Sequence, residues 1–117
     1  VIVYGAEIED LALTDIDTTW TDVTLTLPAF VKRAIVHFIL YANADPDWCK
    51  SYWRTNGSGD NGHRTGSVRH SSYGPSVSDD TADVITDSSQ KIEVKNDVSG
   101  DQRIYCHTNG WYFPIGM

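Results

Sequence analysis

The sequence has little positive charge and no long apolar run. Its 117 residues include 9 Lys and Arg side chains against 16 Asp and Glu, which gives a formal net charge of −7 at pH 7. Binding to a nucleic-acid backbone or to an anionic membrane surface needs clustered Lys and Arg, so we expect no nucleic acid as a partner. No stretch approaches the ~20 consecutive apolar residues that span a bilayer, so we expect no membrane insertion.

Strong helix formers are also scarce. Thr, Ser, Asp, Gly and Asn are abundant instead, and no window repeats apolar residues at helical spacing over several turns. This composition is typical of short strands joined by turns, and it predicts an all-β protein. The length suits one domain, so we expect residues 1–117 to form a single β-sandwich domain, with residues 1–17 as a linker or an edge-strand segment.

Only two cysteines are present, Cys49 and Cys106. They allow at most one disulfide, which would need their strands to be neighbours, and buried free thiols are the alternative. Cys106 precedes His107, but adjacent strand residues point to opposite faces, so they cannot form a nucleophile–base pair. Serine-nucleophile, phosphate-binding and dinucleotide-binding motifs are also missing. We therefore expect no enzymatic activity and no catalytic residues.

The longest apolar segment, residues 34–43, organises the rest of the chain. It is rich in β-branched and aromatic residues, and Pro28 and Pro46 lie on either side of it. A bounded run of this kind predicts a strand buried on both faces at the centre of a sheet. The interior of a sandwich covers only one of these faces. The other face therefore needs loops or another subunit over it.

Shorter segments with alternating apolar and polar residues predict the other strands. They lie at residues 1–4, 20–27, 48–54, 67–72, 82–86, 91–95 and 103–114. About eight short strands at this spacing predict an antiparallel β-sandwich of jelly-roll type. Residues 56–66 hold four glycines and predict a long flexible loop, and a second loop is expected at residues 73–80. Asn109-Gly110 indicates a hairpin or a bulge, and the short stretch after it favours the bulge.

Histidines and carboxylates give no clear metal motif. His63 lies in the glycine-rich loop with Asp60 nearby, and His70 follows its end. This spacing is too loose to predict a transition-metal site, and we expect His37 to be a hydrogen-bonded imidazole in the central strand. Acidic clusters occur at Asp15/Asp17, Asp45/Asp47 and Asp79/Asp80/Asp83. None matches a calcium-binding helix–loop–helix motif, so we expect solvated turn carboxylates and no cofactor, with a structural calcium ion as the open alternative.

Aromatic side chains are the strongest candidates for a binding surface. Tyr52-Trp53 and Trp111-Tyr112 are consecutive, so one ring of each pair faces away from the core unless a second layer covers it. Exposed aromatics stack on sugar rings or become buried between subunits. We expect the ligand- or partner-binding residues to be Trp53, Asn56, Asp60, His63, Tyr73 and Trp111.

Several of these patterns together resemble a known group of proteins. Residues 20–25 lead through a proline-containing turn to the long apolar strand, and a later strand ends in Arg54-Thr55-Asn56-Gly57-Ser58-Gly59. Residues 84–95 have the pattern Val-Ile-x-Asp-Ser-x-x-x-Ile-x-Val-Lys, and Gly100 and an aromatic last strand follow. Over residues 18–114, the chain resembles the small β-sandwich modules of tailed-phage virions, which occur in tail fibres, head fibres and capsid decoration proteins.

The resemblance implies a non-enzymatic structural or adhesive module on a virion surface. Such modules are commonly trimeric, so the expected partners are other copies of this chain, other virion proteins or a cell-surface or polysaccharide glycan. The alternative is a carbohydrate-binding module of an extracellular enzyme. In that case, Trp48, Trp53 or Trp111 would form the platform for the sugar ring.

Overall fold

The computed structural model describes residues 2–13, 18–42, 49–68, 76–97 and 102–114. These residues contain eight strands and no helix. The strands are β1 (Ile2–Leu13), β2 (Thr21–Thr24), β3 (Arg33–Ala42), β4 (Cys49–Thr55), β5 (His63–Val68), β6 (Ser76–Ile85), β7 (Lys91–Asn96) and β8 (Gln102–Tyr112).

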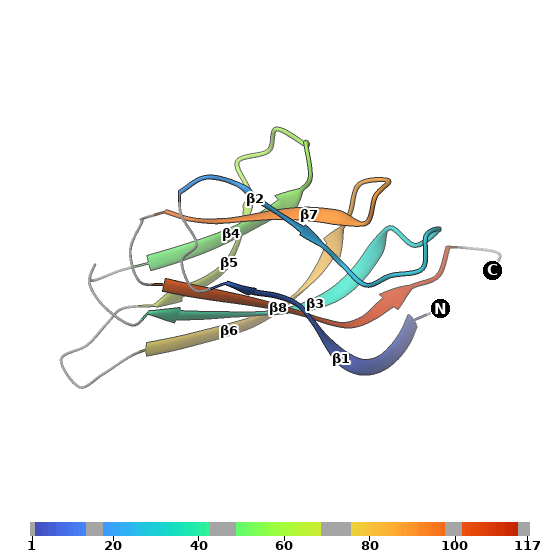
Figure 1. The fold of residues 1–117 in the computed structure, drawn as a ribbon, viewed down its shortest axis with the longest axis horizontal. Helices are drawn as coiled ribbons and strands as arrows, with labels where there is room; N and C mark the ends of the chain where they lie inside the picture. Colours follow the sequence, from blue (N-terminus) through green and yellow to red (C-terminus); the bar gives the residue numbers. More distant parts are fainter. Residues whose placement is uncertain (1, 14–17, 43–48, 69–75, 98–101, 115–117) are drawn as a thin grey trace.

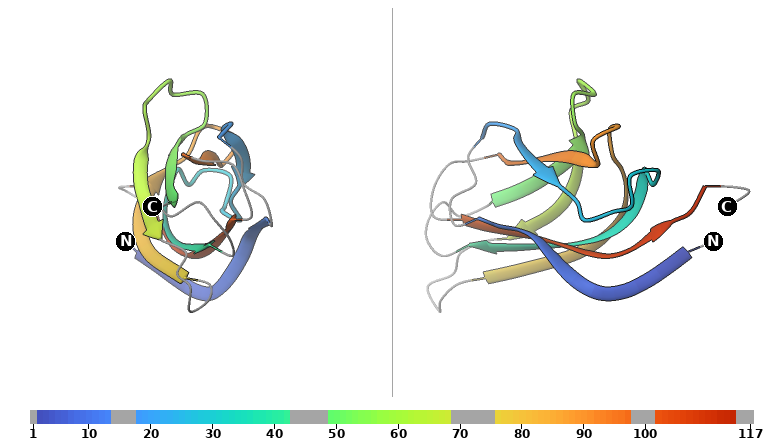
Figure 2. Two further views of the ribbon diagram at one scale, coloured as in Figure 1. Left: turned by 90° about the vertical axis from the view of Figure 1, so that its left-hand side faces the viewer. Right: turned by 45° about the vertical axis from the view of Figure 1, so that its right-hand side comes forward.

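The strands form two four-stranded antiparallel sheets that pack face to face (Figures 1 and 2). One sheet has the order β1-β8-β3-β6 and the other β2-β7-β4-β5. The first strand therefore pairs with the last, the second with the second-last, and so on: β1 with β8, β2 with β7, β3 with β6 and β4 with β5. This nested pairing is the double Greek-key connectivity of a jelly roll, and it confirms the predicted fold class.

The central apolar segment forms β3, which lies between β8 and β6 as the sequence predicts. Its inward residues are Ala34, Val36, Phe38 and Leu40, all buried in the hydrophobic core. Its outward residues are Ile35, His37, Ile39 and Tyr41, of which the last three are partly exposed. Among the described residues, no second layer of strands lies over this outer face (Figure 1).

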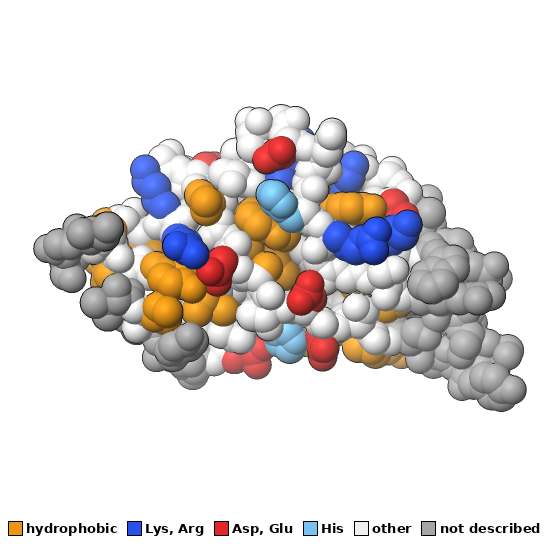
Figure 3. All heavy atoms as spheres, turned by 180° about the vertical axis from the view of Figure 1, so that it is seen from behind, with side chains coloured by type: hydrophobic (Ala, Val, Ile, Leu, Met, Phe, Trp, Pro, Cys, Tyr) orange, Lys and Arg blue, Asp and Glu red, His pale blue; other side chains and the backbone are white. Residues whose placement is uncertain are grey.

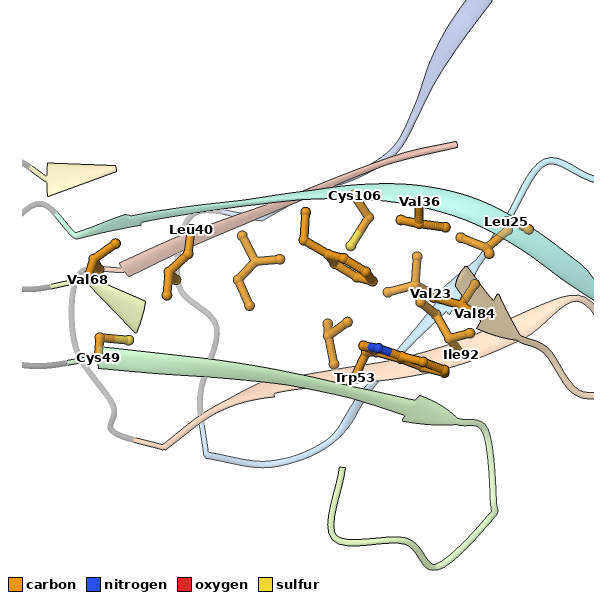
Figure 4. Packing of buried hydrophobic residues seen from close by; sticks show 14 residues of the cluster. Val23, Leu25, Val36, Leu40, Cys49, Trp53, Val68, Val84, Ile92 and Cys106 are labelled. Carbon is orange, nitrogen blue, oxygen red and sulfur yellow. The ribbon is translucent and has the colours of Figure 1, made fainter. Parts of the chain in front are cut away.

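Side chains from both sheets fill the interior (Figure 4). Val23, Ile92 and Val94 enter it from β2 and β7, and the inward orientation predicted for Ile92 and Val94 is confirmed. Each fully buried aliphatic side chain of this kind contributes about 1.5–3 kcal/mol relative to an exposed one. Cys49 on β4 and Cys106 on β8 belong to opposite sheets. Both are buried free thiols, which was the alternative to a disulfide between them.

The predicted bulge at Asn109 is confirmed by the pairing of β3 with β8. Ile35 pairs with Gly110 and Val36 with Thr108, so Asn109 has no partner on β3. The extra residue shifts the alternation of β8 by one position. As a result Trp111, which pairs with Ala34, packs against the core.

Several predicted strand bounds were wrong, all for strands at the edge of a sheet. β1 extends to Leu13, well beyond the predicted residues 1–4, and β2 is shorter than the predicted residues 20–27. β5 begins at His63, so the glycine-rich loop covers residues 56–62 and not 56–66. β6 begins at Ser76, not at residue 82, which places Asp79 and Asp80 on a strand and not in the predicted loop. Edge strands can be polar because one side is solvated, and their pairing relies on backbone hydrogen bonds that the side-chain pattern does not reveal.

Candidate functional site

His37 on β3 and His107 on β8 are direct cross-strand partners. Both point outward, because Phe38 and Cys106 beside them fill the core. Residues that face each other in this way have Cβ atoms about 4.5–5.5 Å apart, so their side chains meet. The two imidazole rings lie with their centroids 6.2 Å apart and at 83° to each other.

Glu7 joins the two histidines from the neighbouring strand β1. The pairing of β1 with β8 is irregular here, since Tyr4 pairs with Gly110 and Ile8 with Thr108. Irregularities of this kind redirect a side chain relative to the regular pleat. Glu7 Oε1 accepts hydrogen bonds from His37 Nδ1 at 3.1 Å and from His107 Nδ1 at 2.9 Å. One carboxylate oxygen therefore bridges both rings.

Hydrogen bonding also favours the ionised form of Glu7. The bond from His37, followed by the bond from His107, lowers the pKa of the Glu7 carboxyl below its ordinary value. The side chains of Glu7, His37 and His107 are 48%, 26% and 19% exposed. The group is therefore an ionised carboxylate at the solvent-facing side of two half-buried imidazoles.

A carboxylate also faces the other nitrogen of each ring. Asp79 Oδ2 on β6 lies 3.8 Å from His37 Nε2, and Glu9 Oε1 lies 3.6 Å from His107 Nε2. Both distances are longer than a hydrogen bond. His107 Nε2 is buried and has no hydrogen-bond partner. Seen from behind, the lower margin of the molecule shows a histidine side chain between acidic ones (Figure 3).

We call Glu7, His37 and His107 the imidazole cluster. The sequence predicted a hydrogen-bonded His37 but did not bring the three residues together. The sequence shows on which face of its strand each histidine lies relative to its neighbours, but it does not show how the two strands are aligned. Only the pairing of β3 with β8 shows that His37 and His107 face each other. Glu7 lies in the segment whose structure the sequence left open.

The residues expected to bind a ligand or partner do not form one surface. Trp53 is 7% exposed and belongs to the hydrophobic core. Its ring contacts that of the exposed His63, with centroids 4.8 Å apart. Trp111 packs against the core on the other sheet. Tyr73 lies outside the described residues.

Asn56 and Asp60 belong to the glycine-rich loop and contribute to its anchoring. Asn56 Nδ2 donates to Asp87 Oδ2 at 2.8 Å, and the carbonyl oxygen of Asp60 accepts from Arg54 Nη1 at 2.8 Å. The Asp60 side chain itself is exposed.

The acidic clusters considered for calcium are only partly described. Asp79 and Asp83 pair with the outward residues Ile39 and Ile35, whereas Asp80 pairs with the inward Phe38. Strand alternation therefore separates Asp80 from the other two. Asp15, Asp17, Asp45 and Asp47 lie outside the described residues, as does His70.

Comparisons with known proteins identify no family for this chain. No protein-family model and no curated protein matches the sequence. Among solved structures, the chain is similar to one in the structure of infectious bursal disease virus, Gx strain, with 11% sequence identity and a TM-score of 0.29. The match covers 94% of this chain and 30% of the viral chain. In the described part of the chain, no helix has the length and apolar character needed to cross a bilayer.

Proposed function

We propose that the chain is a non-enzymatic structural and adhesive module of a virion surface, which assembles with copies of itself as a homotrimer or with other virion proteins. One observation carries the proposal. The outer face of β3 leaves Ile39 and Tyr41 partly exposed at the centre of a sheet, although the strand is apolar on both faces. A strand of this composition is normally covered on both sides. A neighbouring subunit supplies the missing cover.

The side chains around β3 have the composition of an interface. The guanidinium of Arg103 lies over the ring of Tyr41, at 5.7 Å from its centroid. That of Arg33 lies over Tyr112 at 4.2 Å. Tyr and Arg are enriched in protein interfaces and at their hot spots, because both offer a large contact area together with a polar end. The jelly-roll connectivity supports the proposal, since viral capsid domains often use it.

The alternative is a carbohydrate-binding module of an extracellular enzyme. Lectin domains also use the jelly roll, and the partly exposed rings of Tyr41 and Tyr112 offer faces on which a sugar ring stacks. Trp53 cannot serve as the platform while it is buried in the core. Glycan binding is also compatible with a virion module, so the assembly state has to be measured first.

Size-exclusion chromatography with light scattering tests the proposal. We expect the protein to elute as a trimer, and Ile39→Glu and Tyr41→Ala to shift it to a monomer without changing the fold, as followed by circular dichroism. Tyr52→Ala is the matched control, because Tyr52 is a partly exposed aromatic on the outward face of β4 in the other sheet. A wild-type monomer that is retarded on polysaccharide affinity gels supports the carbohydrate-binding module instead.

A further inference from the structure

The imidazole cluster offers three metal-ligand atoms on one face of a sheet. One atom each from Glu7, His37 and His107 lies within 4.8 Å of the others. We propose that this cluster binds a divalent transition-metal ion, with Zn²⁺ as the preferred ion. The cluster lies on the outer face of β3 that the proposed assembly would cover, but its three ligand side chains come from a single chain, so zinc binding and assembly are measured separately.

The ligand chemistry selects the class of ion. Two imidazoles and one carboxylate form a donor set that suits zinc and its neighbours in the first transition series. Calcium and magnesium prefer sites built from oxygen atoms alone, so they are poor occupants of a site with two nitrogen ligands. Three protein ligands leave a fourth tetrahedral position, which a water molecule can fill.

The two distances from Glu7 to the rings are close to the ligand separations of a zinc site. Zinc bonds of about 2.0–2.1 Å place tetrahedral ligands roughly 3.4 Å apart. Glu7 Oε1 already lies 3.1 Å from His37 Nδ1 and 2.9 Å from His107 Nδ1. Glu7 is half exposed, so its side chain can adjust without disturbing the core.

The carboxylates behind the rings supply the second observation. A metal-bound histidine usually donates its other N–H to a carboxylate, which fixes the tautomer and the ring orientation. Asp79 and Glu9 stand at these positions, opposite Nε2 of His37 and of His107. When Nδ1 of each ring binds the metal, the proton resides on Nε2 and points at its carboxylate. The buried His107 Nε2 has no hydrogen-bond partner in the structure, and a small movement of Glu9 toward it from 3.6 Å would give its proton an acceptor.

Charge favours the ion as well. The carboxylates of Glu7, Glu9 and Asp79 surround two imidazoles that are neutral when they bind a metal. The chain carries a net charge of −7, so its field attracts cations in general. The ligand atoms, and not the electrostatic field, determine which cation binds. Because the ligands come from β1, β8 and β3, the bound ion connects the edge strand β1 to the middle of its sheet.

Calorimetric titration of the tag-free protein with ZnCl₂ tests the site. We expect one Zn²⁺ per chain and a higher melting temperature when the site is saturated. Glu7→Gln, His37→Ala and His107→Ala should each lower the affinity more than the ~10–100-fold that the loss of an outer-shell partner costs. Asp79→Asn and Glu9→Gln should lower it by roughly 10–100-fold. His63→Ala is the matched control, since His63 is an exposed histidine on the other sheet, and it should leave the affinity unchanged.

A spectroscopic measurement identifies the ligand atoms. In ¹⁵N-labelled protein, zinc should shift the Nδ1 resonances of His37 and His107 and place the remaining proton of each ring on Nε2. Backbone amides of β1 should exchange more slowly with solvent once zinc binds, because the ion fixes the edge strand to β8 and β3. The resonances of His63 should not move.

Three results would overturn the proposal. The first is the absence of zinc binding at millimolar concentration in a protein whose far-ultraviolet circular dichroism shows an intact β fold. The second is binding that persists in the Glu7→Gln/His107→Ala double variant, which would place the ion elsewhere. The third is displacement of zinc by an equal concentration of CaCl₂, which would indicate diffuse binding to surface carboxylates. Thermal melts of each variant without metal separate a lost ligand from a lost fold.

Discussion

Arg54 on β4 and Glu93 on β7 face each other across the sheet and form an ion pair. Arg54 Nη2 and Nε each lie 2.9 Å from Glu93 Oε2. The other carboxylate oxygen accepts from the backbone N–H of Gly57 at 2.7 Å, and Arg54 also donates to the carbonyl of Asp60. The pair therefore fixes the glycine-rich loop to the sheet. A long loop predicted to be flexible is in fact held at Gly57 and Asp60 by this pair, and at Asn56 by Asp87.

Removing Glu93 should therefore be costly. Its side chain is 8% exposed and that of Arg54 is 17% exposed, so Glu93→Ala leaves a largely buried guanidinium without its anion. We expect a loss of about 3 kcal/mol in the free energy of unfolding, measured by urea denaturation. The control is Asp83→Ala, which breaks the ion pair with Arg33 whose side chains are 54% and 43% exposed. The loss for Asp83→Ala should stay below about 1 kcal/mol. Equal losses for Glu93→Ala and Asp83→Ala would show that burial of the ion pair does not determine its contribution to stability.

Gly62 should not tolerate a side chain. Its φ is +100°, and a Cβ atom there would lie 2.7 Å from Trp20 Cη2 and 3.2 Å from Tyr52 Cβ. Gly62→Ala should cost about 2–4 kcal/mol, from left-handed strain together with the steric clash. Gly59 separates the two effects, because its φ is +75° but a Cβ there meets nothing within 4 Å. Gly59→Ala should cost only about 1–2 kcal/mol. If Gly62→Ala and Gly59→Ala lowered the melting temperature equally, Trp20 would move away from the new Cβ atom at little energetic cost.

Sequence patterns were sufficient where burial decides the structure. β3 and β7 were predicted close to their observed bounds, since their inward positions carry Val36, Phe38, Ile92 and Val94. The start of β5 and the start of β6 were misplaced, because both are edge strands with many polar residues. Backbone pairing to an established neighbour determines these segments. Side-chain periodicity does not contain that information.

The orientation of Trp53 was accessible from the sequence, although we expected a binding role. Lys50, Tyr52 and Arg54 alternate along the strand and lie on one face. Because two of them are charged, that face points to solvent, and Cys49, Ser51 and Trp53 point to the core. The imidazole cluster was not accessible in this way. Its assembly depends on the register between strands far apart in the chain and on an irregularity in β1.

The two thiols should be inert while the protein is folded. Cys49 and Cys106 are both fully buried. Burial raises the pKa of the Cys49 thiol to about 12 and that of Cys106 also far above its ordinary value, so the reactive thiolate is almost absent at pH 8. A disulfide-exchange reagent should label both thiols rapidly in urea, whereas in buffer labelling should be as slow as unfolding of the protein. Rapid labelling of either cysteine in buffer would contradict the buried position.

The turn between β6 and β7 should make stability depend on pH through Asp87. The hydrogen bond from Asn56, followed by that from the backbone of Lys91, lowers the pKa of the Asp87 carboxyl. Asp87 Oδ1 accepts from the N–H groups of Ser89 and Lys91 at 2.8 and 2.9 Å, next to Gln90 with its φ of 60°. A carboxyl group whose pKa is lower in the folded state stabilises the fold above its unfolded pKa of about 3.9. This contribution disappears as the pH falls through the folded pKa.

Urea denaturation of the wild type and Asp87→Ala between pH 7 and pH 3 measures this contribution. We expect a difference of about 1 kcal/mol at neutral pH, kept small by solvent screening, which shrinks below about pH 4. Asp60→Ala is the control, because the hydrogen bonds of Asp60 in the described structure use its backbone atoms. Its effect on stability should be small and nearly constant over this pH range. A wild-type advantage over Asp87→Ala that persists undiminished at pH 3 would show that the neutral carboxyl group caps the turn equally well.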